Sequence, residues 1–123
     1  MGGGAGLMFA SSYKITTERT RFAMPEIGVG LFPDVGFTHE IKKLPEGLGL
    51  YIMLTATNLN AADTAFCNLT NSTLNSNDFD EFYTDIKQLA WVDNHDENIK
   101  LLDSLINQKK YLTNTQSLSL IHI

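Results

Sequence analysis

The sequence predicts an α/β fold, and three groups of residues carry that prediction. Residues 14–23 alternate apolar and polar side chains and are rich in Thr and Ile, which is typical of β-strands. Residues 48–55 form a compact apolar run that indicates a buried helix. Residues 78–91 and 93–107 repeat apolar side chains every three or four positions, which predicts two amphipathic helices. The chain should therefore combine short strands with several helices.

The composition is that of one globular domain with an acidic balance. The chain has 123 residues, of which 43% are hydrophobic and 19% charged, and a domain usually contains about 100–200 residues. Nine Lys and Arg against fourteen Asp and Glu leave a net charge of −5. A protein that binds nucleic acid through phosphates needs a basic surplus, and a membrane helix needs about 18–20 apolar residues. The sequence has neither feature, so we expect no nucleic-acid partner and no membrane partner.

One cysteine and three widely spaced histidines disfavour a disulfide framework and a metal site. Cys67 has no second cysteine to pair with. His39, His95 and His122 lack the spacing of a helical metal pair. The first residues also lack the basic and apolar stretches of a signal peptide. We therefore expect no metal ion and no secretion.

The chain should begin with a turn that opens a helix. Residues 2–4 are glycines, and residues 5–12 supply helix formers that are apolar on most faces. Backbone N–H groups at such a helix N-terminus stabilise an anion, either a phosphate or an oxyanion. No Gly-Lys-Ser/Thr follows, which rules out a phosphate-binding P-loop. The alternative is a turn with a structural role only.

Residues 14–23 predict two short strands joined by a turn at Glu18 and Arg19. Pro25 has no N–H and disfavours helical backbone in the residue before it. The second strand should therefore end there, which leaves Glu26 on a loop.

The middle of the chain predicts an ordered loop and three helices. Residues 27–36 contain three glycines and a proline among apolar side chains, which indicates the loop. Asp34 at its end could cap a helix that reaches about Leu44. The apolar run 48–55 gives the second helix, and a third begins at Asn60.

The composition changes near residue 68, from glycine-rich and apolar to rich in Asn and Asp. Residues 68–77 therefore predict a loop or linker. We divide the chain into residues 1–67, residues 68–115 with the amphipathic helices, and a tail at residues 116–123.

Both ends of the sequence are unusual for a domain. A glycine-rich turn that opens a helix usually follows a strand, and none precedes this one, so we expect the natural chain to begin upstream. Residues 118–123 are Leu-Ser-Leu-Ile-His-Ile. They are a short strand, a frayed terminus, or the translation of an adapter used in DNA library preparation. We interpret residues 116–123 as a non-native tail.

Two carboxylates lie on the glycine- and proline-rich loop. Carboxylates near apolar neighbours serve as base, acid or nucleophile in enzymes, so Glu26 and Asp34 are candidate catalytic residues. The structural alternative is that Asp34 caps a helix while Glu26 pairs with Arg19 or Arg21, which alternate along the expected strand.

Several motifs taken together resemble the crotonase superfamily, and within it the 3-hydroxyisobutyryl-CoA hydrolase group. The motifs are GGGAGL at residues 2–7, TERTRFAMPEIGVGLFPDVG at 17–36, LPEGLGLYIMLT at 44–55 and NAAD at 60–63. The resemblance is close over residues 1–67. It implies a partial crotonase-like fold, namely the second half of the ββα spiral core, followed by a mainly helical segment.

The resemblance also implies roles for individual residues. Gly3 matches the glycine whose N–H forms half of an oxyanion hole, with Gly4 beside it. Glu26 matches the catalytic glutamate, proposed as nucleophile or general base. Asp34 matches the second acidic residue, which orients substrate or water. Gly6 stands where enoyl-CoA hydratases carry a second catalytic glutamate, so the hydrolase group fits better.

The implied activity is hydrolysis of a short-chain 3-hydroxyacyl-CoA thioester, as in valine breakdown, with an acyl-CoA as substrate and no cofactor. The full-length protein could form oligomers, and would be mitochondrial in a eukaryote or cytoplasmic in a bacterium. An upstream half would supply the other oxyanion donor, so the chain alone should be inactive. Two alternatives remain, namely another crotonase-type hydratase or isomerase, and a non-catalytic CoA-binding or interaction protein.

This sequence departs from the family pattern at two glycine positions. Phe37 and Ala56 each stand where the family has glycine, and Phe37 is expected to crowd the loop after Asp34.

The implied chemistry sets a geometric expectation. A thioester carbonyl must meet its attacking group and its oxyanion donor together. The Gly3 N–H, Glu26 and Asp34 should therefore face one open, partly apolar groove, lined or supported by Ile27, Leu31 and Phe32.

Overall fold

The computed structural model of this protein describes Met1 and residues 3–108. Along the chain its elements are α1 (Gly3–Ala10), β1 (Ile15–Thr17), η1 (Pro25–Val29), α2 (Phe37–Glu40), η2 (Ile41–Lys43), α3 (Leu48–Thr55), α4 (Ala61–Phe66), β2 (Ser72–Leu74), η3 (Ser76–Asp78), α5 (Phe79–Gln88) and α6 (His95–Gln108), where η marks a 3-10 helix.

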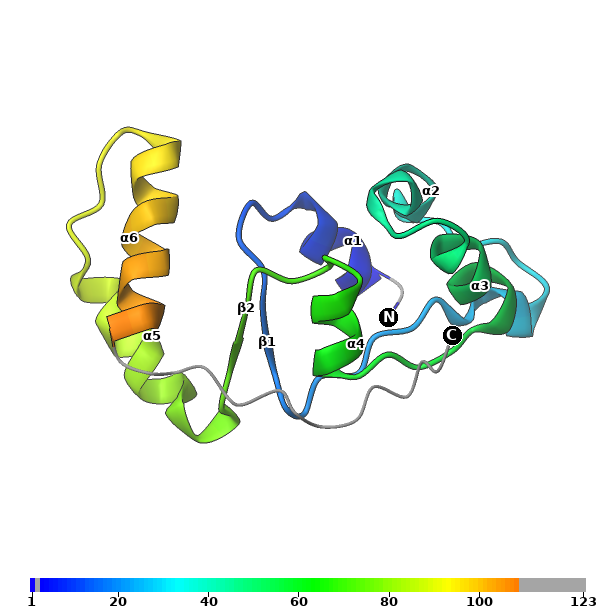
Figure 1. Ribbon diagram of the computed structural model, residues 1–123, viewed down its shortest axis with the longest axis horizontal. Helices are drawn as coiled ribbons and strands as arrows, with labels where there is room; N and C mark the ends of the chain where they lie inside the picture. Colours follow the sequence, from blue (N-terminus) through cyan, green and yellow to red (C-terminus); the bar gives the residue numbers. More distant parts are fainter. Residues whose placement is uncertain (2, 109–123) are drawn as a thin grey trace.

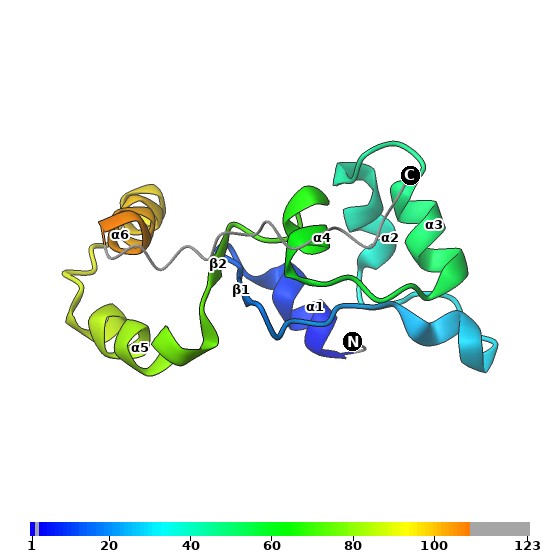
Figure 2. The same cartoon turned by 60° about the horizontal axis from the view of Figure 1, so that its bottom comes forward.

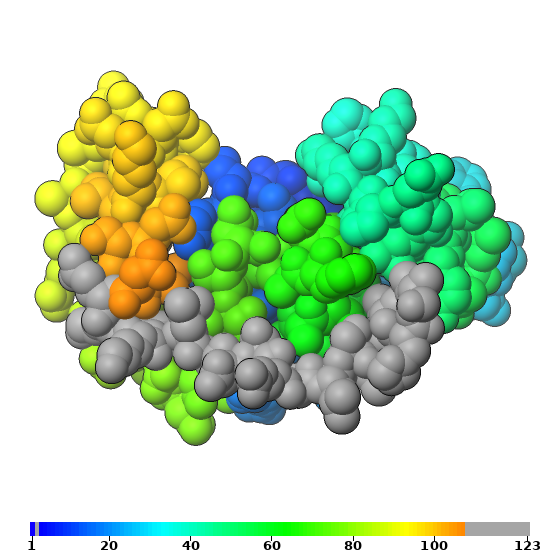
Figure 3. All heavy atoms as spheres, viewed as in Figure 1, coloured from blue at the N-terminus to red at the C-terminus, as the bar shows by residue number. Residues whose placement is uncertain are grey.

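The elements form three groups along the longest axis of the molecule. Figures 1 and 2 both show α5 and α6 at one end, β1 and β2 with α1 and α4 in the centre, and α2 with α3 at the other end. The space-filling view shows a hollow between the two end groups, with α1 at its floor (Figure 3). The candidate site residues belong to the central group and to the end that contains α2 and α3.

The two strands pair in parallel, with Thr16 opposite Thr73 in the register. The strand β2 lies inside the segment 68–77, so the expectation that this segment is only a loop was wrong. A short run of Ser and Thr becomes a strand here because β1 supplies the pairing partner. The Asn71 side chain extends the pairing of the two strands, since its Oδ1 accepts a hydrogen bond from the Lys14 N–H at 2.8 Å.

The predicted turn at Glu18 and Arg19 is confirmed, and the Thr20 N–H donates to the Thr17 carbonyl across it at 2.9 Å. The predicted second strand is reduced to one antiparallel bridge between Phe22 and Leu59. Two backbone hydrogen bonds of 2.9 and 2.7 Å form that bridge. The segment therefore pairs with a distant part of the chain rather than continuing a hairpin.

Two hydrophobic clusters hold the molecule together. The larger joins the central group to α2 and α3, and its buried members are Ala5, Phe22, Met24, Phe37, Leu44, Leu48, Ile52, Leu59, Cys67 and Leu69. The smaller joins α5 and α6 to the strands, through buried Leu74, Phe82 and Ile106 with Tyr13 and Ile15 packed against them. Residues near β1 therefore contribute to the second cluster, although they precede residue 68.

The helices α3 and α4 were predicted within one or two residues of their observed bounds. Gly49 in α3 allows a close approach, because a Cβ at this position would overlap the Ile41 side chain. In α4, Asn60 accepts from the Asp63 N–H at 2.9 Å and Asp63 Oδ2 accepts from the Asn60 N–H at 3.0 Å. This reciprocal pair is a capping box that begins the helix.

The two amphipathic helices are confirmed as α5 and α6: α5 ends at Gln88, before the predicted residue 91, and α6 begins at His95, after the predicted residue 93. Across residues 3–108, none of the helices combines the length and apolar character needed to cross a membrane. The predicted tail at residues 116–123, with residues 109–115 before it, lies outside the described residues.

Candidate active site

Glu26 lies in the first turn of η1, directly after Pro25. Met24, which precedes Pro25, is fully buried, and the fixed φ of proline suits the first position of a helical turn. The Glu26 side chain is half-buried. Its Oε2 atom is enclosed and has no hydrogen-bond partner within the described part of the chain. Enclosed polar atoms without a partner are uncommon in folded proteins and often occur at functional sites.

The backbone around Glu26 is closed into a compact turn. The Leu31 N–H donates to the Glu26 carbonyl at 3.0 Å, and the Gly30 N–H donates to the Ile27 carbonyl at 3.1 Å. Gly30 takes a left-handed φ of 77° to close the turn, a conformation that favours glycine. The packing of α3 against η1 supports this turn from one side. Glu26 is therefore held by its main chain while its side chain remains available.

The surface beside Glu26 is apolar and exposed. Ile27, Val29, Leu31 and Phe32 have 44–76% of their surface exposed. Exposed apolar side chains that follow one another in a loop are typical of a surface that binds something apolar. Their exposure agrees with the expected lining, which stays a prediction.

Asp34 is exposed on the loop between Pro33 and α2, and it does not cap that helix with its side chain. The expected N-cap was wrong. The Phe37 N–H instead bonds to the main-chain carbonyl of Asp34 at 2.9 Å, and Gly36 precedes the helix with φ 83°. The expected helix to Leu44 consists of α2 followed by η2.

The helix α1 begins at Gly3, so Gly3 and Gly4 lie in its first turn, while Gly2 lies outside the described residues. A Cβ at Gly3 or Gly4 would meet nothing within 4 Å. The first N–H groups of a helix have no partner within the helix, so this end combines free donors with open space. That arrangement suits an anion or a developing oxyanion.

The next turn of α1 contacts the acidic loop. A Cβ on Gly6 would lie 3.0 Å from Val35 Cβ, which is tighter than ordinary contact. The structure therefore brings α1 and the residue after Asp34 together. That the Gly3 N–H, Glu26 and Asp34 share one cavity stays a prediction.

Arg19 and Arg21 do not lie on one strand, because β1 ends at Thr17. The Arg21 guanidinium donates to the Thr20 carbonyl at 2.9 Å. The ion pair found among the described residues joins Lys43 to Glu40 at 2.8 Å, and it includes neither arginine nor Glu26. The structural alternative in which Glu26 pairs with an arginine is therefore wrong for this structure.

Comparison with known proteins identifies the family. A model of the enoyl-CoA hydratase/isomerase family matches residues 1–122. The chain belongs to the enoyl-CoA hydratase/isomerase family.

Relatives within this family share sequence over about half of the chain. It is 48% identical over 69 residues to probable 3-hydroxyisobutyryl-CoA hydrolase 2 of Arabidopsis thaliana, covering 56% of this chain and 18% of the relative. It is 48% identical over 63 residues to the mitochondrial 3-hydroxyisobutyryl-CoA hydrolase of Xenopus tropicalis, covering 51% of this chain and 16% of the relative. The chain thus spans less than a fifth of the length of these relatives.

Solved structures of the enoyl-CoA hydratase/isomerase family confirm the predicted fold class. A carnitinyl-CoA dehydratase from Mycobacterium thermoresistibile matches with TM-score 0.71 and 28% identity, over 88% of this chain and 28% of that one. An enoyl-CoA hydratase from Rhodobacter sphaeroides matches with TM-score 0.69 and 28% identity, over 87% of this chain and 33% of that one. The chain therefore has part of the crotonase-like fold.

The two departures from the family's glycines have different structural consequences. Phe37 is fully buried and its ring lies 5.7 Å from that of Phe9 and 6.2 Å from that of Phe22, between centroids. The ring therefore anchors α2 in the core, in place of the expected crowding. Ala56 takes the left-handed backbone expected of glycine, with φ 53°.

The single cysteine is not a candidate nucleophile. Cys67 is fully buried at the end of α4. Burial, with a smaller contribution from the nearby Asp63 carboxylate, raises the pKa of its thiol to about 11. The reactive thiolate is therefore scarce at neutral pH.

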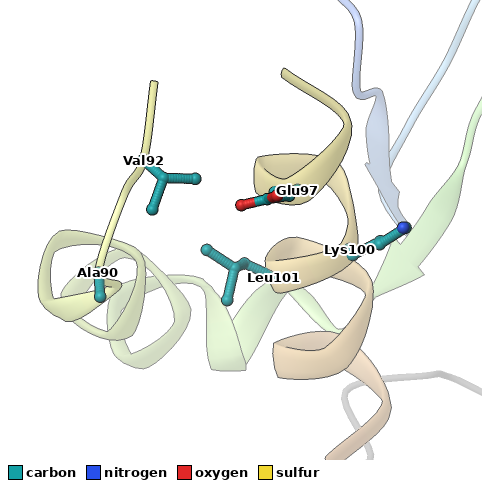
Figure 4. A pocket seen from close by; sticks show the side chains of 5 residues that line it. All are labelled: Ala90, Val92, Glu97, Lys100 and Leu101. Atoms are coloured by element: carbon teal, nitrogen blue, oxygen red, sulfur yellow. The ribbon is translucent and has the colours of Figure 1, made fainter. Parts of the chain in front are cut away.

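No feature of the sequence predicts a pocket of about 330 Å³ that lies between α6 and the segment after α5. Figure 4 shows Glu97 and Leu101 pointing toward Val92, while Lys100 points away. The pocket is formed by Ala90 and Val92 of the segment between α5 and α6 and by three side chains of α6, at the opposite end of the molecule from α2 and α3 (Figure 1). Periodicity predicted the helices but not how their side chains meet.

Proposed function

We propose that this chain supplies part of the active site of a hydrolase that cleaves a short-chain 3-hydroxyacyl-CoA thioester, such as 3-hydroxyisobutyryl-CoA. The observation that carries the proposal is Glu26, whose enclosed Oε2 has no partner among the described residues and lies beside an exposed apolar surface. The names of the relatives support the substrate class. An acyl-CoA brings an apolar acyl chain and an electrophilic carbonyl to such a surface.

In the proposed reaction, water and the thioester become a carboxylic acid and the free thiol of CoA. Glu26 either attacks the carbonyl carbon, forming an anhydride that water then opens, or removes a proton from the attacking water. The carbonyl oxygen becomes negative in the tetrahedral intermediate. The Gly3 N–H stabilises that charge, with Gly4 beside it, and one such donor is worth about 3–4 kcal/mol.

Asp34 is suited to a supporting role in this reaction. Its carboxylate is exposed, while its main chain is fixed by the hydrogen bond to Phe37. In the proposed site it orients the substrate or water and assists proton transfer. The thioester is already activated, so the proposed chemistry needs no cofactor.

Hydration of an enoyl-CoA is the second candidate, because solved relatives include a hydratase and a dehydratase. The structure argues against it at Gly6. The position resembles that of the second hydratase glutamate, and here even a Cβ would lie 3.0 Å from Val35 Cβ. The space for a second carboxylate is therefore filled by the acidic loop.

The test places this sequence in a whole enzyme. The 63-residue stretch that matches the Xenopus tropicalis relative is exchanged into that protein, and CoA thiol release from 3-hydroxyisobutyryl-CoA is measured. We expect free CoA without enoyl-CoA. Replacement of Glu26 by Gln should lower kcat about 100-fold or more, the range typical of a lost catalytic base.

The matched control is Glu46→Gln, which changes an exposed glutamate in the loop before α3 and should leave kcat unchanged. Thioester cleavage that is normal in the Glu26→Gln enzyme would instead support a non-catalytic CoA-binding protein. Enoyl-CoA as the product would support the hydratase. Folding of each variant is checked by circular dichroism.

The proposed location follows from the same relatives. Several are named mitochondrial. We infer a mitochondrial location for this protein in a eukaryote and a cytoplasmic one in a bacterium.

A further inference from the structure

We propose that Val35 is a positioning residue that holds the Asp34 carboxylate in place against the N-terminal end of α1, by docking on Gly6. This inference rests on the proposed function. It adds a residue that touches no substrate in the proposed mechanism and that acts through Asp34.

The backbone of Val35 is the first line of support. Its φ is 47°, in the left-handed region where a β-branched residue is strained. Such a conformation persists only when the surroundings impose it, and strained residues cluster at active sites. Val35 is half-buried and packs on the larger hydrophobic cluster. The fold therefore holds this residue in an unfavourable conformation directly beside Asp34.

The contact with Gly6 is the second line of support. A Cβ built on Gly6 would lie 3.0 Å from Val35 Cβ, 3.5 Å from Val35 Cγ1 and 3.6 Å from the Val35 carbonyl oxygen. Gly3 and Gly4 have open space at the same distance. The first turn of α1 is thus open at its donor end and closed by Val35 one turn later. Three residues of helix rise about 4.5 Å, so Val35 docks close to the proposed oxyanion donor.

A second contact fixes the same loop from its other end. The Phe37 N–H bonds to the Asp34 carbonyl at 2.9 Å, and the Phe37 ring lies 5.7 Å from the Phe9 ring of α1. The segment from Asp34 to Phe37 is therefore attached to α1 at two points. This double attachment sets the position of the carboxylate relative to the helix that bears Gly3.

The proposal makes Val35 Cβ the decisive atom. Replacement by Ala keeps this atom, whereas replacement by Gly removes it and also relieves the backbone strain. A residue needed only for stability should not lose activity when strain is relieved. Loss of a positioning residue should lower activity even when strain is relieved, because an error of about 1 Å in the placement of a catalytic group costs up to about 100-fold in rate.

The activity test uses the Xenopus tropicalis relative into which the matching stretch of this chain has been exchanged. For Val35→Gly we expect kcat to fall about 10- to 100-fold, with KM changed less than about threefold and no loss of thermal stability beyond a few degrees. For Val35→Ala we expect kcat within about threefold of the parent, because the contacting Cβ remains. Ala56→Gly is the matched control, since it relieves the same kind of strain at the end of α3, and its kcat should not change.

The structural test uses the 123-residue chain itself and does not depend on activity. Backbone amide signals of Gly3, Gly4 and Gly6 are compared by nuclear magnetic resonance. Val35→Gly should shift all three signals, while Ala56→Gly should leave them in place. Val35→Ala should shift them much less than Val35→Gly.

Each outcome decides one proposal. If the parent enzyme has no thioesterase activity, the proposed function is overturned. The amide signals still test the contact between Val35 and Gly6 in that case. Unshifted Gly3 and Gly4 signals in Val35→Gly overturn the positioning role, whatever the activity. An active parent whose kcat survives Val35→Gly also overturns it, while leaving the proposed function intact.

Discussion

Ala56 has a backbone conformation that is unfavourable for a residue with a Cβ. It ends α3 with φ 53°, and its N–H donates to the Ile52 carbonyl at 3.1 Å. This is the usual geometry of a helix C-terminus, where glycine is favoured because it has no Cβ to strain. Alanine at this position keeps the hydrogen bond but carries the strain, which costs about 1 kcal/mol.

We expect Ala56→Gly to raise the free energy of unfolding by about 0.5–1 kcal/mol, since relieved strain exceeds the added entropy of the unfolded glycine. Urea denaturation of the chain measures the change. Thr55→Gly, one residue earlier and still helical, is the control and should lower stability by about 0.5–1 kcal/mol. A drop in stability for Ala56→Gly would contradict the strain argument.

Glu18 shows how one side chain begins a distant helix. Its carboxylate accepts from the Ser76 N–H at 2.8 Å and also from the Ser76 hydroxyl, at the start of η3 and α5. The hydrogen bond from the Ser76 side chain, then that from its backbone, lowers the pKa of Glu18 below its ordinary value of 4.5. The contact ties the turn after β1 to the helix after β2.

The sign of the pH dependence follows from this lowered pKa. The folded state binds the Glu18 proton more weakly than the unfolded state, so the contact stabilises the fold above about pH 4.5. That stability is lost as the pH falls through the folded pKa. We expect Glu18→Gln to flatten this part of the acid transition in thermal melts between about pH 3 and 7. Glu46→Gln is the control, and an unchanged acid transition in Glu18→Gln would exclude the contact as its cause.

At the scale of the whole molecule, Tyr13 links the strands to the last described helix. Its hydroxyl donates to Asp103 Oδ1 of α6 at 2.6 Å and lies 2.8 Å from Ser72 Oγ of β2. Burial, followed by the hydrogen bond to Asp103, raises the pKa of Tyr13 to about 12. Tyr13 also packs on the smaller cluster, together with Leu105 of α6.

We expect Tyr13→Phe to lower the free energy of unfolding by about 1 kcal/mol, the usual worth of a partly buried hydrogen bond. Because the folded pKa is raised, the parent should also lose stability as the pH rises from about 10 to about 12. The variant should lack this alkaline loss, as chemical denaturation at several pH values would show. A double-mutant cycle with Asp103→Asn gives the coupling between the two side chains. An additive result would rule out the link.

The division of the chain at residue 68 also belongs to this scale. Each cluster draws mainly on one side of that residue, but β1 and β2 pair across it. The division stays a prediction, as do the roles of Gly3, Gly4, Glu26 and Asp34. Family membership, by contrast, is shown over residues 1–122.

The sequence by itself determined the features that local signals encode. The helices α3 and α4, the turn at Glu18 and the two amphipathic helices follow from periodicity and capping residues within a few positions of each other. The motifs around Glu26 and Asp34 likewise indicated the family before any fold was known. Such signals are local because helices and turns form hydrogen bonds between residues close in sequence.

Only the tertiary structure decided which distant segments meet. The strand β2, the bridge between Phe22 and Leu59, and the docking of Val35 on Gly6 each need a partner far along the chain. Composition and spacing do not state which partner that is, because strand pairing and close packing depend on the path of the whole backbone. The strained φ of Val35 has the same origin, since long-range packing on α1 overrides what the residue prefers locally.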